Sequence, residues 1–194
     1  MATLEEVLQF WFSDPQSEEA QYSRRRKVWF SKNPEIDQTI HRRFLMTYEQ
    51  AASGELDGWQ ATPAGCLALI LLLDQFPRNL FRGQPQAFAT DPQARILALR
   101  AIAQGFDQSL APIQRIFIYL PLEHGETLSD QHQSVTLFQQ LTDQNPELAD
   151  VLDYAVRHQI VIERFGRFPH RNAILGRTST AAELEFLNQP GSSF

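Results

Sequence analysis

The feature that most constrains the fold is an uninterrupted apolar run, Cys66–Leu73, which leads directly into Asp74. A run of this kind has no polar face, so the segment is expected to be buried on every side. Pro77 lacks a backbone N–H group and is expected to end the helix that contains the run. The rest of the chain must therefore supply the surfaces that cover this segment.

The covering surfaces are predicted to be helices. Apolar residues recur with helical spacing between start and stop signals, such as the capping box at Thr3, the cap at Asn33-Pro34 and the glycine stop at Gly54. The expected helices span 3–12, 34–53, 64–74, 92–104, 113–120, 129–141, 146–165 and 180–187. Strand-like alternation of useful length is not found. We therefore predict a single all-α domain over residues 1–194, with about eight or nine helices packed as αα-hairpins.

Composition argues against several classes of protein. The net charge of −6 argues against general nucleic-acid binding. The single cysteine, Cys66, excludes an intrachain disulfide and a cysteine-rich metal site. The apolar run is far shorter than the ~20 residues that span a bilayer, and no signal peptide is visible at the N-terminus. We expect a cytoplasmic protein with no membrane or nucleic-acid partner.

The first group of candidate site residues follows the apolar run. The helix macrodipole and desolvation both disfavour the Asp74 carboxylate at the end of a buried helix. Asp74 therefore needs a partner, and Arg78 or Arg82 is close enough in sequence, with Asn79 between them. Two interpretations stay open. The group is either an internal salt bridge that fixes the helix-to-turn geometry, or a ligand-binding or catalytic carboxylate held by arginine.

The second group combines a carboxylate with imidazoles. Glu123 and His124 are expected in a loop, after a helix that Pro121 stops. Such a pair suits acid–base chemistry or metal binding, but no metal-binding spacing is present, so we assign no metal and no other cofactor. His158 falls on the apolar face of the helix 146–165. It is either a core histidine satisfied by one hydrogen bond or a histidine of a pocket.

The third group is a basic, turn-rich segment near the C-terminus. Residues 164–177 contain no acidic side chain, although the whole chain is acidic. The polar residues concerned are Arg164, Arg167, His170, Arg171, Asn172 and Arg177. If the turns fold inward, the segment could cradle a phosphate or a carboxylate. The alternative is that these arginines neutralise acidic helices and cap helix C-termini.

Several long phrases resemble a known family. They are LALILLLDQFPRNLFRG, AFATD, YLPLEH, RFGRFPHRNAILGR and FLNQPGSSF. The chain is similar across essentially its whole length to the bacterial proteins grouped as domain of unknown function nine-two-four. The resemblance implies an all-helical, tetratricopeptide-like fold in a bacterial protein, and it implies no activity. Gly125 departs from the family pattern, in which we expect a serine after the Glu-His pair.

These groups lead to one hypothesis about function and one alternative. The chain is expected to bind a small anionic ligand, with hydrolase or transferase chemistry possible, where the three groups converge. The catalytic candidates are Asp74, Glu123, His124 and His158, and the ligand-binding candidates are Arg78, Asn79, Arg82, Arg164, Arg167, His170, Arg171 and Asn172. The alternative is a protein-interaction module that binds a peptide or a partner chain in a concave groove. Purely structural roles for all these residues are a third interpretation, and the oligomeric state is not predicted.

Overall fold

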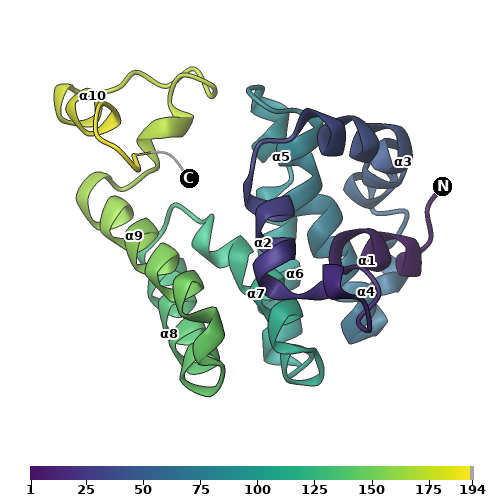
Figure 1. The fold of residues 1–194 in the computed structure, drawn as a ribbon. Coiled ribbons are helices and arrows are strands. Elements are labelled where there is room, and N and C mark those ends of the chain that lie inside the picture. The colour runs from purple at the N-terminus through teal and green to yellow at the C-terminus, as the bar shows by residue number, and fades with distance from the viewer. Residues whose placement is uncertain (193–194) are drawn as a thin grey trace. The chain divides into compact units, whose positions relative to one another are not determined.

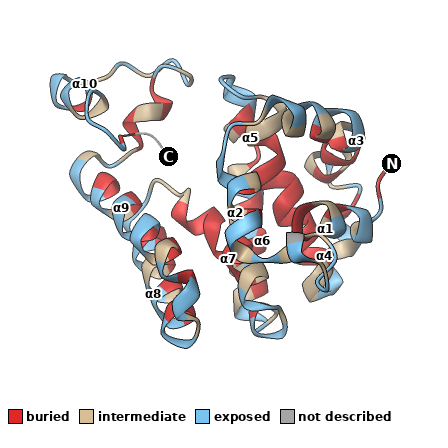
Figure 2. Cartoon of the chain, viewed as in Figure 1, coloured by how far each residue is buried: buried red, intermediate tan, exposed pale blue. Residues whose placement is uncertain are grey.

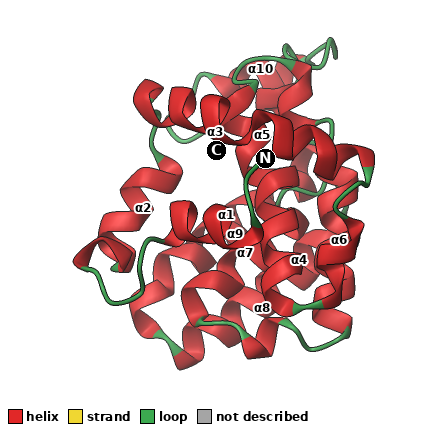
Figure 3. Ribbon diagram, turned by 90° about the vertical axis from the view of Figure 1, so that its right-hand side faces the viewer, coloured by secondary structure: helices red, strands yellow, loops and turns green. Residues whose placement is uncertain are grey.

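A computed structural model describes residues 1–192, and Figure 1 labels its helices. In this part of the chain every regular element is helical and no strand occurs (Figure 3). The all-α prediction is therefore confirmed. The two final residues of the phrase FLNQPGSSF lie outside the described residues.

The chain forms two compact units. The first comprises Met1–Arg82 and Gln86–Pro121, and the second comprises Gly83–Pro85 and the chain from Leu122 onward. A single domain with tetratricopeptide-like stacking stays a prediction. None of the described helices is long and apolar enough to cross a bilayer.

Local signals set the ends of the helices in the first unit. These helices are α1 (Leu4–Phe12), α2 (Tyr22–Phe30), α3 (Pro34–Ser53), α4 (Pro63–Ile70), α5 (Phe76–Leu80), α6 (Asp91–Ala103) and most of α7 (Pro112–Glu123). Thr3 caps α1 in the predicted capping box. Asn33 caps α3 through its side-chain oxygen, and Gly54 ends α3 with φ of 84°, which glycine adopts without strain.

The helix α4 lies at the centre of the first unit. The chain is buried from Gly65 to Pro77, and Figure 2 shows this burial in red on α4. The ring centroid of Phe76 lies 5.0 Å from that of Phe44 and 5.3 Å from that of Trp11. Burial of a side chain as large as phenylalanine contributes roughly 1.5–3 kcal/mol, so this aromatic cluster is a main source of the unit's stability.

The structure corrects the expected end of the central helix. The chain does not leave the helix at Pro77 but passes through a π-helical turn, Leu71–Gln75, into α5. Pro77 has no N–H to donate to the carbonyl oxygen four residues earlier, and a wider turn accommodates its ring. That oxygen, on Leu73, instead accepts a hydrogen bond from the Thr90 hydroxyl at 2.6 Å. A tertiary contact therefore replaces the missing helical bond.

The second unit is organised around a pair of packed helices, α8 (Leu128–Gln144) and α9 (Ala149–Phe165). Thr127 caps α8 by accepting a hydrogen bond from the Asp130 N–H. The helix therefore begins slightly before the predicted position. Gly166 ends α9 in the left-handed region, with φ of 68°. A short helix, α10 (Ala181–Leu187), follows and begins with a capping box formed by Thr180 and Glu183.

Pro121 does not stop α7 either. This helix continues to Glu123. Glu123 was expected in a loop, but it is the last residue of the helix. Proline in a helix interior removes one hydrogen bond and costs ~3 kcal/mol. The side chains on either side of it, Leu120 and Leu122, are buried, and their burial offsets this cost.

Candidate functional site

The structure places Asp74 in the π-helical turn of the first unit, fully buried. Its carboxylate accepts a hydrogen bond from Gln75 Nε2 at 2.5 Å, and Oδ1 lies 3.4 Å from Nη1 of Arg78. Arg78 also donates to the backbone carbonyl of Asp74 and holds Asp91 through two bonds of 3.0 and 3.1 Å. The arginine partner expected for Asp74 is therefore Arg78.

Asn79 and Arg82 share a different carboxylate, that of Asp37 in α3. Asn79 donates to it at 2.7 Å, and Arg82 donates through two bonds of 2.9 Å. The pKa of Asp37 lies below its ordinary value. Burial acts to raise this pKa, but the hydrogen bonds from Arg82 and Asn79 lower it by more. Because Arg78 and Arg82 both hold carboxylates of the chain itself, this arrangement favours the structural interpretation of the first group.

The second unit brings together a different set of candidates around a buried pair, Glu123 and His158. Oε1 of Glu123 lies 3.1 Å from Nδ1 of His158, and each side chain is 4% exposed. The same Nδ1 lies 2.8 Å from the carbonyl oxygen of Tyr154. A carbonyl oxygen can only accept, so the contact assigns the proton to Nδ1 and the basic lone pair to Nε2.

Aromatic and basic side chains surround this pair. The ring of His158 meets that of Phe168 edge-on at 5.4 Å, and the His124 ring lies 6.4 Å away. The guanidinium of Arg171 lies 4.8 Å from the centre of the Phe168 ring, and the ring of His170 lies 5.6 Å from it. Arg171 is buried, whereas His124 and His170 are half-buried. We call Glu123, His124, His158, His170 and Arg171 the Glu–His cluster.

The electrostatics of the cluster favour a neutral His158. Burial lowers the pKa of His158 to about 3, and the nearby charges of His124, Arg171 and His170 act in the same direction. The hydrogen bond to the Tyr154 carbonyl acts in the opposite direction. A neutral imidazole with a carboxylate on Nδ1 and a lone pair on Nε2 is the arrangement of a general base.

Sequence reasoning missed Gln131, which positions Glu123. Gln131 lies on the buried face of α8, and its Nε2 donates to the carbonyl oxygens of Glu123 and Gly125, both at 2.7 Å. It therefore ties down the C-terminus of α7. Gly125 itself faces Asp130, because a Cβ at this position would lie 2.7 Å from Oδ2 of Asp130. The glycine therefore fits this turn, and a serine would displace the aspartate.

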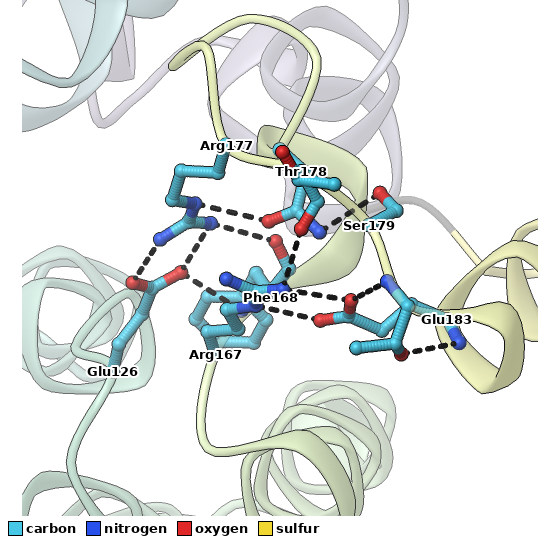
Figure 4. A network of polar contacts seen from close by, with 9 residues as sticks. Glu126, Arg167, Phe168, Arg177, Thr178, Ser179 and Glu183 are labelled. Atoms are coloured by element: carbon cyan, nitrogen blue, oxygen red, sulfur yellow. Dashed lines mark hydrogen bonds and ion pairs between the residues drawn. The ribbon is translucent and has the colours of Figure 1, made fainter.

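Two further acidic residues that sequence reasoning missed, Glu126 and Glu183, hold the basic segment in place (Figure 4). Glu126 accepts from the Phe168 N–H at 2.8 Å and from two nitrogens of Arg177 at 2.7 and 3.0 Å. Glu183 accepts from two nitrogens of Arg167 at 2.6 and 2.8 Å. These bonds from Arg167 are the main reason why the pKa of Glu183 falls to about 2.

The remaining candidates stand apart from the Glu–His cluster. Asn172 is buried and bonds to Ser179 and Arg177. Arg164 is exposed, and its guanidinium stacks over Phe165 at 4.7 Å. Arg167 and Asn172 thus have structural partners, and Arg164 faces solvent. For Glu126 the only signal in the sequence was its charge, because 42 to 51 residues separate it from its partners. Glu183 was expected only as the capping-box partner of Thr180.

The structure therefore assembles part of the predicted site. It brings Glu123, His124, His158, His170 and Arg171 together in the second unit, whereas the first-unit residues form their own ion-pair network. That the two groups share one site stays a prediction. Among residues 1–192, no group of three or more histidine, cysteine or acidic side chains is placed to hold a metal ion.

Comparisons with known proteins identify the chain's relatives. The family model described as "Bacterial protein of unknown function (DUF924)" matches residues 7–191. A solved structure, described as a protein of unknown function, ATU0120, from Agrobacterium tumefaciens, has 40% sequence identity and a TM-score of 0.82. The similarity covers 95% of this chain and 96% of that one. No curated protein matches the sequence. Since the match runs over nearly the whole chain, this protein belongs to the DUF924 family of bacterial proteins.

Proposed function

We propose that the second unit binds a small anionic molecule at the Glu–His cluster and moves a proton there, as a hydrolase or a transferase would. The observation that carries this proposal is the buried contact of 3.1 Å between Glu123 and His158, with Arg171 close by. The cytoplasmic location expected from the sequence belongs to the same proposal.

The charges around His158 support an anionic ligand. Three basic side chains, those of His124, His170 and Arg171, disfavour a proton on His158. A negatively charged ligand is attracted by the same three groups and offsets their effect on the imidazole. Binding of an anion should therefore raise the pKa of His158 and be accompanied by proton uptake.

The position of Glu123 supports acid–base chemistry. A carboxylate on Nδ1 holds an imidazole in one tautomer and stabilises the imidazolium that forms when Nε2 accepts a proton. Gln131 fixes the backbone from which Glu123 projects. Arg171 supplies a planar guanidinium that suits the carboxylate or phosphate group of a ligand.

The first-unit candidates are a weaker part of this proposal. Asp74, Arg78, Asn79 and Arg82 would complete the ligand site if they meet the Glu–His cluster. Arg78 and Arg82, however, already pair with the carboxylates of Asp91 and Asp37. We therefore centre the experiment on Arg171 and His158.

The test is thermal stabilisation by a panel of inorganic phosphate, phosphate monoesters and small carboxylic acids, followed by calorimetry on each compound that stabilises. Arg171→Gln should abolish the stabilisation and Arg171→Lys should restore part of it. Arg100→Gln, at an exposed position in the first unit, is the matched control and should respond as the wild type does.

The calorimetric arm tests proton uptake. The heat of binding measured in buffers of different ionisation enthalpy should show net proton uptake that grows as the pH is lowered from neutral toward the pKa of His158, and His158→Gln should remove it. A panel without any stabilising anion, or Arg171→Gln that binds as tightly as Arg100→Gln, would overturn the proposal. The peptide-binding alternative would then be favoured.

A further inference from the structure

Two buried polar atoms on α8 have no hydrogen-bond partner among residues 1–192. They are Oε1 of Gln131 and Oγ of Ser134, and both residues are 0% exposed. The residues are three positions apart, so their side chains are neighbours on the buried face of the helix. A buried polar group without a hydrogen bond destabilises a fold. A further group is therefore needed to satisfy both atoms.

The orientation of the Gln131 amide is fixed by its nitrogen. Nε2 donates to the carbonyl oxygens of Glu123 and Gly125, both at 2.7 Å, and to that of Leu122 at 3.4 Å. The reverse orientation would turn Oε1 toward three carbonyl oxygens, and none of these can donate a hydrogen bond. Oε1 is therefore an acceptor that requires an O–H or N–H donor.

The hydroxyl of Ser134 does not make the bond that other hydroxyls of α8 make. The hydroxyls of Thr136 and Thr142 each donate to the carbonyl oxygen four residues earlier, at 2.8 and 3.0 Å. No such bond is found for Ser134 within the described residues. A serine hydroxyl can donate one hydrogen bond and accept others, so it is available to a group beside α8.

The register of α8 and α9 places Ser134 near His158. The two helices lie side by side and are joined by a short connection, so they run antiparallel (Figure 1). Nε2 of His132 lies 4.0 Å from Oε1 of Glu163, so these two positions are level. Ser134 is then level with Val161, which is about 4.5 Å along the helix axis from His158. The side chains of Ser134 and His158 are both buried and belong to the same part of the second unit.

We propose that Oε1 of Gln131 and Oγ of Ser134 together bind one internal water molecule, beside the Glu–His cluster. Water can donate to the amide oxygen and accept from the serine hydroxyl. Two hydrogen bonds of about 2.8 Å match the spacing of side chains three positions apart on a helix. Because both residues are 0% exposed, a larger group reaches neither atom unless side chains move. Internal waters with two to four polar partners are ordinary parts of globular proteins.

This inference deepens the proposed function, and its functional part rests on that proposal. Gln131 bonds to the backbone of Glu123, whose carboxylate lies 3.1 Å from His158. The water is thus held by the same elements as the proposed general base. Hydrolysis requires water as a reactant, whereas group transfer is protected by excluding it. A water site at this place therefore favours a hydrolase over a transferase.

The first experiment is a crystal structure of the full chain without added anions, at a resolution that shows ordered water. A water oxygen is expected at about 2.7–3.2 Å from both Oε1 of Gln131 and Oγ of Ser134. The proposal is overturned if Ser134 instead donates directly to Gln131, or to the carbonyl oxygen of Asp130, with no water between them.

The second experiment counts long-lived internal waters in solution by relaxation dispersion of the water NMR signal. The wild type should hold one more than Ser134→Ala, because a water that keeps only Gln131 has too few partners to persist. Ser129→Ala, at an exposed position on the same helix, is the matched control and should give the wild-type count. Circular dichroism checks that both variants are folded. Equal counts for the wild type and Ser134→Ala contradict the water site.

The two proposals fail in different ways. Neither experiment contains an anion, so the water site is tested independently of the ligand panel. If the water is found and no anion binds, the site stands and its role in hydrolysis is refuted. If anions bind and the water is absent, the proposed function stands and this inference falls.

Discussion

Replacement of His158 by glutamine should change how the stability of the protein depends on pH. His158 is buried beside Glu123, and its pKa falls from an ordinary 6.5 to about 3 in the folded chain. Between these values the unfolded chain binds a proton that the folded chain does not. The stability that the neutral imidazole contributes is therefore complete above pH 6.5 and is lost as the pH falls toward 3.

The magnitude follows from the pKa values. Each pH unit below 6.5 costs about 1.4 kcal/mol of unfolding free energy. At pH 5.0 the wild type should therefore have lost about 2 kcal/mol through this one group. The His158→Gln variant has a lower stability throughout, but it lacks this titration. The difference between the two proteins should shrink by about 2 kcal/mol between pH 7.5 and pH 5.0.

Urea denaturation followed by circular dichroism measures this difference. The control is the matched substitution His132→Gln at an exposed position on α8. Titration of the five histidine signals by NMR, with His158 assigned from the variant, gives its pKa directly. The opposite sign, with the wild type losing its advantage as pH rises through 7, would mean that the Glu123 charge outweighs burial. That result would refute the reasoning.

Three further substitutions test a close backbone approach, a hydrogen bond and an ion pair. Gly65→Ala should destabilise the protein by about 2–4 kcal/mol, although alanine favours helix, because its Cβ would lie 1.9 Å from the Trp59 carbonyl oxygen. Urea denaturation should show no such loss for Gly58→Ala, where no atom lies within 4 Å. Thr90→Val should cost about 1–2 kcal/mol because it leaves a buried carbonyl in the π-helical turn without a donor, and Thr90→Ser should keep most of the stability. Glu183→Gln should cost about 1–3 kcal/mol at pH 7, with the loss fading as the pH falls from 4.5 toward 2, where the wild-type carboxylate also takes up a proton.

The two prolines show where prediction from the sequence failed. Pro77 and Pro121 were expected to end helices, but the chain stays helical through both. At Pro77 the missing hydrogen bond is replaced by the Thr90 hydroxyl, which comes from a different part of the unit. A prediction based on neighbouring residues does not include a donor that lies far away in the sequence. The same error placed Glu123 in a loop, whereas it is the last residue of a buried helix.

The sequence by itself determined the all-helical class and the ends of most helices. Helix caps act within one turn of helix, so they can be recognised from neighbouring residues in the sequence. Examples are the capping box at Thr3, the cap at Asn33 and the glycine at Gly54. The sequence also singled out His158 as a histidine on the apolar face of a helix, and Glu123 as a candidate for acid–base chemistry.

Only the tertiary structure decided which of these polar residues meet. Arg82 and Arg177 were candidates for a ligand, yet each holds a carboxylate 45 or 51 residues away, on Asp37 and Glu126. Ion pairs of this kind depend on distance in space, which sequence spacing does not encode. The contact between Glu123 and His158 has the same origin, since it forms where the end of α7 meets the buried face of α9. Local hydrogen bonds thus determine where the helices begin and end, and long-range packing determines which polar residues come into contact at the candidate site.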